Sequence, residues 1–202
     1  CGRVAINFDQ IDVDLLSLSS HKLGGPMGIG ALIVRDGFNL GSLIGGGGQE
    51  RRRRAGTENV AAIAGFGAAA GAAQVGLEAE AKRLRELRDQ AAEALIECAP
   101  GAVVIGGQAE RLGNTLCIAL PGELAETTVI KLDLAGVAIS AGSACSSGKV
   151  GASHVLKAMG VAPDLARSAV RVSLGWNTSG TSLETFLTRF RGLFPVDNRA
   201  VA

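Results

Sequence analysis

The stretch Ser17-Leu18-Ser19-Ser20-His21-Lys22-Leu23-Gly24-Gly25-Pro26 decides how the rest of this 202-residue chain is interpreted. It places a single lysine between serines and a histidine on one side and two glycines on the other. Apolar runs flank the stretch at residues 13–18 and 27–34. The pattern predicts that Lys22 lies on a short loop between two strands, close to a hydrophobic core.

Two interpretations of Lys22 follow from these residues. A lysine in a turn is most often a solvated surface residue. A lysine becomes a useful amine when burial or a neighbouring positive charge disfavours its ammonium form. Serines, a histidine and glycines together suit a phosphate group. The second interpretation is therefore a Schiff-base lysine that holds pyridoxal phosphate, with Ser19 and His21 near the phosphate.

Composition limits the classes of function. The formal net charge is +1, which implies no strong attraction to nucleic acid or to a membrane surface. The four cysteines form no CxxC pair and no metal-ligand spacing with His21 or His154, so we expect a reducing, cytoplasmic setting. No signal peptide is visible. Because the chain starts at Cys1 and enters a strand-like pattern at once, we expect it to be the C-terminal part of a longer protein.

The first part of the chain predicts strands followed by one long helix. The run at 28–34 is almost entirely apolar, so it is expected to be buried on both faces. Residues 60–77 carry no charge and are dominated by alanine and glycine, which predicts a closely packed helix and not a membrane span. Thr57 is expected to cap this helix, and it is also placed to bind a phosphate at the helix N-terminus, since the two roles do not exclude each other. The other predicted strands of this part are 3–8 and 12–17.

From residue 78 onward the chain alternates between short helices and strands. Residues 78–99 place Leu84, Leu87, Ala91, Leu95 and Cys98 on one helical face. Strands are expected at 103–105, 115–120, 137–139 and 170–174, and helices at 124–134, 153–159 and 182–193. These patterns predict an α/β protein with two domains, residues 1–77 and 78–202.

Two further segments carry candidate chemistry. Cys145 lies in a loop of small and hydroxyl residues at 140–152, so we interpret it as an accessible nucleophilic thiol, although an incidental loop cysteine is the alternative. The arginines at 51–54 are expected to be solvated, at least in part. A nucleic-acid patch is not predicted there, because the run is isolated and has no aromatic residues among it.

Four motifs in this order resemble a known family. They are the Lys22 stretch, Gly46-Gly47-Gly48-Gln49-Glu50 with Arg54-Ala55-Gly56-Thr57-Glu58-Asn59, Ser140-Ala141-Gly142-Ser143-Ala144-Cys145-Ser146-Ser147-Gly148, and Arg171-Val172-Ser173-Leu174-Gly175. Together they resemble the pyridoxal-phosphate cysteine desulfurases of the long-loop, iron–sulfur assembly type, within the class V aminotransferase-like family. The resemblance covers nearly the whole chain and departs at Arg52-Arg53, where family members often carry a glycine and a smaller residue.

The resemblance implies a fold and a set of residue roles. The fold is the C-terminal part of a fold-type I transferase: the end of the large pyridoxal-phosphate domain and the small C-terminal α/β domain. Lys22 matches the lysine that holds the cofactor, Ser19 and His21 match groups at its phosphate, and Thr57 matches a threonine that reaches the phosphate of a partner subunit. Arg171 matches the arginine that binds the substrate carboxylate. Cys145 matches the sulfur-accepting nucleophile, which also becomes a shared iron–sulfur ligand through its persulfide.

The implied function is conversion of L-cysteine to L-alanine by a cytoplasmic homodimer that passes sulfur to an acceptor or iron–sulfur scaffold protein. Two alternatives stay open: a selenocysteine lyase or other enzyme of the same scaffold, and an inactive fragment that binds a partner. The family's stacking histidine, its aspartate at the pyridine nitrogen and part of its phosphate site would precede Cys1. We therefore expect these 202 residues alone to be inactive.

Overall fold

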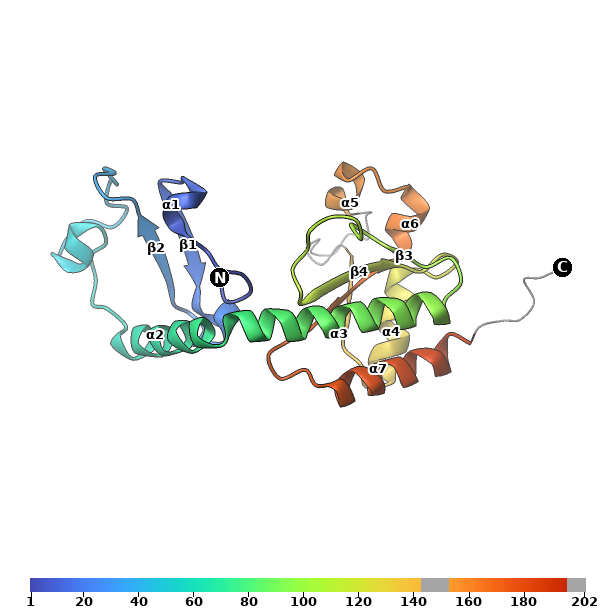
Figure 1. The fold of residues 1–202 in the computed structure, drawn as a ribbon. Coiled ribbons are helices and arrows are strands. Elements are labelled where there is room, and N and C mark those ends of the chain that lie inside the picture. The colour runs from blue at the N-terminus through green and yellow to red at the C-terminus, as the bar shows by residue number, and fades with distance from the viewer. Residues whose placement is uncertain (143–152, 196–202) are drawn as a thin grey trace. The chain divides into compact units, whose positions relative to one another are not determined.

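The structure is a computed structural model that describes residues 1–142 and 153–195 (Figure 1). The chain divides into two compact units, Cys1–Ala79 and Glu80–Ala202. The first unit holds a two-stranded sheet and the second a four-stranded sheet. The predicted domain boundary at residue 77 stays a prediction, and the helix that links the two units runs across it.

The lysine stretch joins the two strands of a hairpin in the first unit. β1 (Leu15–Ser19) pairs antiparallel with β2 (Gly30–Val34), and Ser19 lies opposite Gly30. The connection begins with the 3₁₀ turn η1 (Ser20–Leu23) and turns at Gly24, whose φ of 85° favours glycine. The predicted position of Lys22 between two strands is thus confirmed. The predicted burial of the second strand is wrong: only Val34 of β2 is partly buried, because no described layer covers this hairpin.

The predicted strand at 3–8 is also wrong. No strand forms there, and a single helical turn, α1 (Phe8–Ile11), begins at the last residue of the predicted strand. The side chain of Asn7 accepts hydrogen bonds from the N–H of Asp9 and of the residue after it, and the turn ends at Asp12 in the left-handed region. An asparagine cap of this kind offers the backbone a local alternative to a strand ladder.

Helix α2 (Val60–Val75) forms where the long uncharged segment predicts a helix. Its cap differs from the prediction: the Asn59 side chain accepts a hydrogen bond from the N–H of Ala62 at 3.1 Å, so Thr57 does not cap it. The helix packs on the lysine turn through small residues. A Cβ atom at Gly65 would lie 2.6 Å from Cγ of Pro26, so only glycine permits this approach.

Helix length also bears on the membrane interpretation of residues 60–77. In the parts of the chain that the structure describes, no single helix is long and apolar enough to cross a membrane. Helices α2 and α3 satisfy that criterion only as a bent pair.

The second unit is a four-stranded antiparallel sheet in the order β3-β4-β6-β5. Its elements are α3 (Leu77–Cys98), β3 (Val103–Val104), β4 (Thr115–Ala119), α4 (Ala125–Leu134), β5 (Ser140–Ala141), α5 (His154–Ala158), α6 (Pro163–Ser168), β6 (Ala169–Ser173) and α7 (Gly180–Leu193). The strand predicted at 137–139 forms instead at β5. Helix α6 is not among the helices that the sequence predicts, and Pro163 occupies its first turn, where proline is tolerated.

The two faces of this sheet bury different helices. Alternate residues of β6, among them Val170 and Val172, lie in the main core with α3, α4 and α7. Ala169 of the opposite parity lies in a smaller cluster with Leu156 of α5 and Ala166 of α6. The amphipathic stripe predicted on α3 is confirmed, since all five of its residues are buried. Side-chain parity in β4 and β6 therefore determines which face each residue serves.

Ser20 supplies a stability prediction for the first unit. Its side chain is 0% exposed, and its hydroxyl has no hydrogen-bond partner among the described residues. A buried hydroxyl without a partner costs about 1–3 kcal/mol, so Ser20→Ala should raise the free energy of unfolding by about 1 kcal/mol. Denaturant unfolding of the natural protein that contains this chain measures the change. Ser17→Ala, at an exposed position of β1, is the matched control and should change stability little; a less stable Ser20→Ala variant would show that the hydroxyl has a partner.

Candidate active site

The lysine turn gathers three kinds of polar group on consecutive residues. Ser19 ends β1, and His21 and Lys22 follow within η1, where both are exposed. The turn is fixed by its backbone: the N–H of Ser20 donates to the carbonyl of Ile29 at 3.1 Å, and the N–H of Gly25 donates to the carbonyl of Ser20 at 3.1 Å. An amine suits the aldehyde of pyridoxal phosphate, and a hydroxyl and an imidazole suit its phosphate. The residues present thus fit this cofactor.

The surroundings of Lys22 differ from the expectation of a nearby core. The described residues of the first unit leave the side chain exposed. Of the flanking strands, β2 is largely exposed and β1 alternates between exposed and partly buried residues, with no residue fully buried. The described residues therefore do not supply the desolvation that would favour the free amine. The role of Lys22 stays a prediction that rests on its motif and its place in the turn.

The loop before Thr57 has an unusual backbone. Glu50, Arg51 and Arg52 are consecutive residues with φ of 48°, 55° and 65°. Left-handed conformations cost about 1–2 kcal/mol for each residue with a side chain. Such strain is found at ligand-binding loops when the surrounding structure maintains it. Thr57 follows this loop and is exposed, so the structure places it on the first unit without assigning it a contact.

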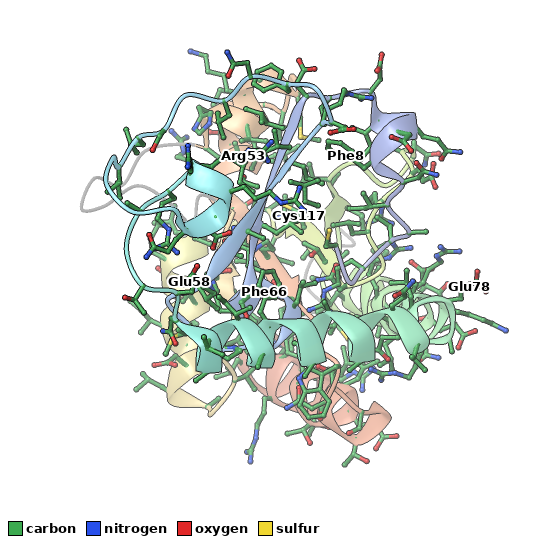
Figure 2. The ribbon with its side chains drawn as sticks, turned by 90° about the vertical axis from the view of Figure 1, so that its left-hand side faces the viewer. Phe8, Arg53, Glu58, Phe66, Glu78 and Cys117 are labelled. Carbon is green, nitrogen blue, oxygen red and sulfur yellow. The ribbon has the colours of Figure 1, made fainter. Side chains whose placement is uncertain are left out.

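The arginine run is largely solvated, as predicted. Arg51, Arg52 and Arg53 are exposed. Arg54 differs: its side chain donates to the carbonyls of Ala55 at 3.4 Å and Gly56 at 3.1 Å. It also lies 3.6 Å from the Glu50 carboxylate. One of the four arginines thus holds its own loop together, and Figure 2 shows Arg53 on the same loop.

Arg171 lies in the second unit, at the centre of a row that crosses three strands. Cys117 of β4 and Ser140 of β5 are its direct partners in the sheet. The Arg171 side chain is partly buried, and its Nε atom is buried without a hydrogen-bond partner among the described residues. A guanidinium group with unused donors suits two-pronged binding of a carboxylate. The role that the resemblance implies for Arg171 stays a prediction.

Cys117 of β4 is the neighbour of Arg171 that the sequence did not point to. Burial raises the pKa of the Cys117 thiol, and the positive charge of Arg171 only partly opposes this effect. A thiol with a raised pKa stays protonated at neutral pH and is a poor nucleophile. The sequence predicts which residues of each strand share a face, but only the register of β4 and β6 shows that Cys117 lies opposite Arg171.

Cys145 lies outside the described residues, which end at Gly142 and resume at Ser153. The residues on either side of the gap are held by hydrogen bonds. The N–H of Gly142 donates to the carbonyl of Ala169 at 2.7 Å, and the side chain of Ser153 accepts from the N–H of Leu156 at 3.4 Å. Since Ala169 begins β6, Gly142, the last described residue before the gap, is held beside the strand that carries Arg171.

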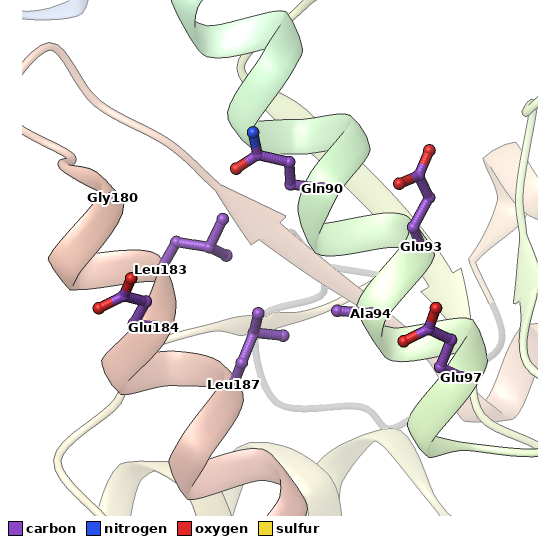
Figure 3. Close-up of a pocket in the computed structure, with 8 residues that line it drawn as sticks. All are labelled: Gln90, Glu93, Ala94, Glu97, Gly180, Leu183, Glu184 and Leu187. Carbon is purple, nitrogen blue, oxygen red and sulfur yellow. The ribbon is translucent and has the colours of Figure 1, made fainter.

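A groove of about 320 Å³ lies between α3 and α7 of the second unit (Figure 3). Leu183 and Leu187 of α7 point toward α3, and Glu93, Glu97 and Glu184 lie at its margin. Of the predicted site residues, those that the structure describes do not line it. Within residues 1–142 and 153–195, no group of three or more histidine, cysteine, aspartate or glutamate side chains is placed to hold a metal ion.

Comparison with known proteins gives concordant results. The sequence matches the family described as "Aminotransferase class-V" over residues 1–186. It is 42% identical over 192 residues to a cysteine desulfurase of Gluconacetobacter diazotrophicus, covering 95% of this chain and 48% of that protein. It is 41% identical over 182 residues to the cysteine desulfurase IscS of Dictyoglomus turgidum, covering 90% of this chain and 46% of that protein.

The solved structures show the same likeness. A NifS-like protein from Rickettsia africae superimposes with a TM-score of 0.85 at 33% sequence identity, over 96% of this chain and 51% of that one. This likeness agrees with the predicted fold class. The chain spans about half the length of the curated relatives it matches.

Proposed function

We propose, from the premise that the chain belongs to the class-V aminotransferase family, that the natural protein is a pyridoxal-phosphate-dependent cysteine desulfurase. The observation that carries this proposal is the identity of 42% over 192 residues with a protein of that name. The lysine turn and the unpartnered Nε of Arg171 support it, because an amine and a carboxylate-binding group are both required to process an amino acid.

In this proposal each residue of the chain has one task. Arg171 binds the carboxylate of L-cysteine through its guanidinium, whose Nε has no partner among the described residues. Lys22 holds the cofactor through its amine, and afterwards moves a proton at the substrate Cα. Ser19, His21 and Thr57 hold the phosphate, Thr57 that of the partner subunit in a homodimer. When bound, pyridoxal phosphate supplies an electron sink for the charge that develops at Cα.

Cys145 performs the sulfur transfer. Its thiolate attacks the substrate sulfur, the bond between that sulfur and Cβ breaks, and the electron pair of the bond remains on the substrate. One proton is added at Cβ and one is returned at Cα, which gives alanine. The transferred sulfur stays on Cys145 as a persulfide. A sulfur-acceptor or iron–sulfur scaffold protein then receives it. The name IscS of one relative supports an acceptor in iron–sulfur assembly.

The proposal is tested by the products that the natural protein forms from L-cysteine with pyridoxal phosphate and a thiol reductant. We expect alanine and sulfide in equal amounts. Pyruvate and ammonia, a transamination product, or no turnover would each contradict it. Faster turnover of selenocysteine than of cysteine would support a selenocysteine lyase instead. Residues 1–202 alone, tested in parallel, are expected to be inactive.

A further inference from the structure

Arg83 of α3 donates hydrogen bonds to three backbone carbonyls of one turn in the second unit. Its guanidinium donates to the carbonyls of Gly175, Trp176 and Thr178, at 3.4 Å for Gly175 and 3.2 Å for Trp176. The same group donates to both carboxylate oxygens of Glu80, at 2.8 and 2.9 Å. The hydrogen bond to Glu80 raises the pKa of Arg83, so the group stays charged. Three carbonyl groups of one turn thus converge on a single permanent cation.

The turn that Arg83 binds directly follows the strand of Arg171. β6 ends at Ser173, and the N–H of Leu174 donates to the carbonyl of Asn114 at 2.8 Å. The next N–H, that of Gly175, donates to the side-chain hydroxyl of Thr178 at 2.8 Å. The turn then enters α7, whose first turn is closed by a capping box. The chain from Arg171 to α7 is therefore held continuously by hydrogen bonds.

This binding requires an arginine. Converging carbonyl groups need several donors in a fixed plane, which a guanidinium supplies and an ammonium does not. Without Arg83, the carbonyls of the turn lose those donors. The turn itself then keeps the hydrogen bond from the N–H of Thr178 to the carbonyl of Gly175 at 3.0 Å, and the end of β6 keeps its pairing with β4 and the hydrogen bonds of Leu174 and Gly175. Arg171 lies four residues before Gly175, close to this end of the strand.

We infer that Arg83 is a positioning residue, which fixes the end of β6 through the Gly175–Thr178 turn and thereby holds the Arg171 guanidinium in place for the substrate carboxylate. This inference rests on the proposed function, because it takes Arg171 as the carboxylate-binding group. It also links α3, the helix that joins the two units of the chain, to the strand that carries that group.

The kinetic test compares Arg83→Ala with Arg85→Ala in the natural protein with its cofactor. Arg85 lies on the same helix and is exposed, so its variant is a matched control. We expect Arg83→Ala to raise the KM for L-cysteine about 10-fold while kcat stays within about twofold, as displacement of a binding group by a remote change would do. Arg83→Lys should recover part of this loss, since an ammonium still donates to one or two carbonyls. An unchanged KM with a lower melting temperature would overturn the inference and leave Arg83 a structural clamp.

Hydrogen exchange supplies a readout that does not depend on activity. If Arg83 acts through the turn on the strand, Arg83→Ala should speed exchange both at Gly175–Thr178 and at residues 171–174 by about 10-fold or more, and Arg85→Ala should not. Faster exchange confined to Gly175–Thr178 would overturn the inference. If the wild-type protein forms no alanine, the proposed function is wrong. Hydrogen exchange would then still show whether the Gly175–Thr178 turn stabilises the end of β6.

Discussion

Replacement of Lys22 by alanine is expected to reduce alanine formation from L-cysteine by about 100- to 10,000-fold, the usual contribution of a residue that moves a proton in the rate-limiting chemistry. The same variant should lose the covalent attachment to the cofactor that we propose for Lys22. Lys82→Ala is the matched control, because Lys82 is an exposed lysine on α3 that belongs to no motif. Its activity should equal that of the wild type.

The attachment itself is measured separately. Borohydride reduction of the loaded natural protein, followed by peptide mapping, should place the pyridoxyl label on Lys22. A label on Lys131, Lys149 or another lysine would refute the assignment. This readout matters because the exposed position of Lys22 in η1 does not by itself distinguish a reactive lysine from a surface one.

Replacement of Cys145 by serine should lower alanine formation from cysteine by more than about 1,000-fold, as expected when a covalent nucleophile is removed. Cofactor binding and cysteine binding should persist, because Lys22 and Arg171 are untouched. Mass spectrometry of the wild-type protein after brief exposure to cysteine should detect one additional sulfur atom on the peptide that contains Cys145.

The other cysteines make this prediction specific. Cys1→Ser, at an exposed position, should leave turnover unchanged. Full turnover in Cys145→Ser would move the nucleophile to Cys117 or Cys98. The structure disfavours both: the pKa of the Cys117 thiol is raised by burial, and Cys98 is buried in the main core, where its sulfur accepts a hydrogen bond from Arg191 at 3.2 Å.

Long periodic patterns predicted the helices of this chain well. The stripe from Leu84 to Cys98 repeats over four turns, and such a repeat has few alternatives to a helix with one buried face. Short patterns were less reliable. Val137 and Ile139 alternate with another residue as in a strand, yet they pack against the core without joining the sheet. Alternation of apolar residues indicates which side chains are buried, whereas a strand also needs a neighbouring strand for its backbone hydrogen bonds.

Local capping explains two other differences. At Asn7, an asparagine side chain caps a helical turn where the apolar pattern predicts a strand. At Asn59, the helix begins at residue 60 as the uncharged pattern predicts, but its cap is Asn59 and not Thr57. The residues of the candidate site also differ in whether the sequence alone could identify them. The polar residues of the lysine turn are consecutive in the sequence, so the sequence alone identifies them. The pairing of Arg171 with Cys117 and Ser140 depends on strand register, which a single sequence does not specify.

The two-faced sheet of the second unit has a consequence for how this sequence can vary. Arg171 shares its parity in β6 with Ala169, whereas Val170 and Val172 face the opposite helices. Insertion or deletion of one residue within β6 would turn the guanidinium into the apolar core and a valine toward Cys117. Insertions and deletions among natural homologues should therefore be absent from β4 and β6 and occur in the connections between them. We expect selection to maintain the register of the two strands as well as the arginine itself.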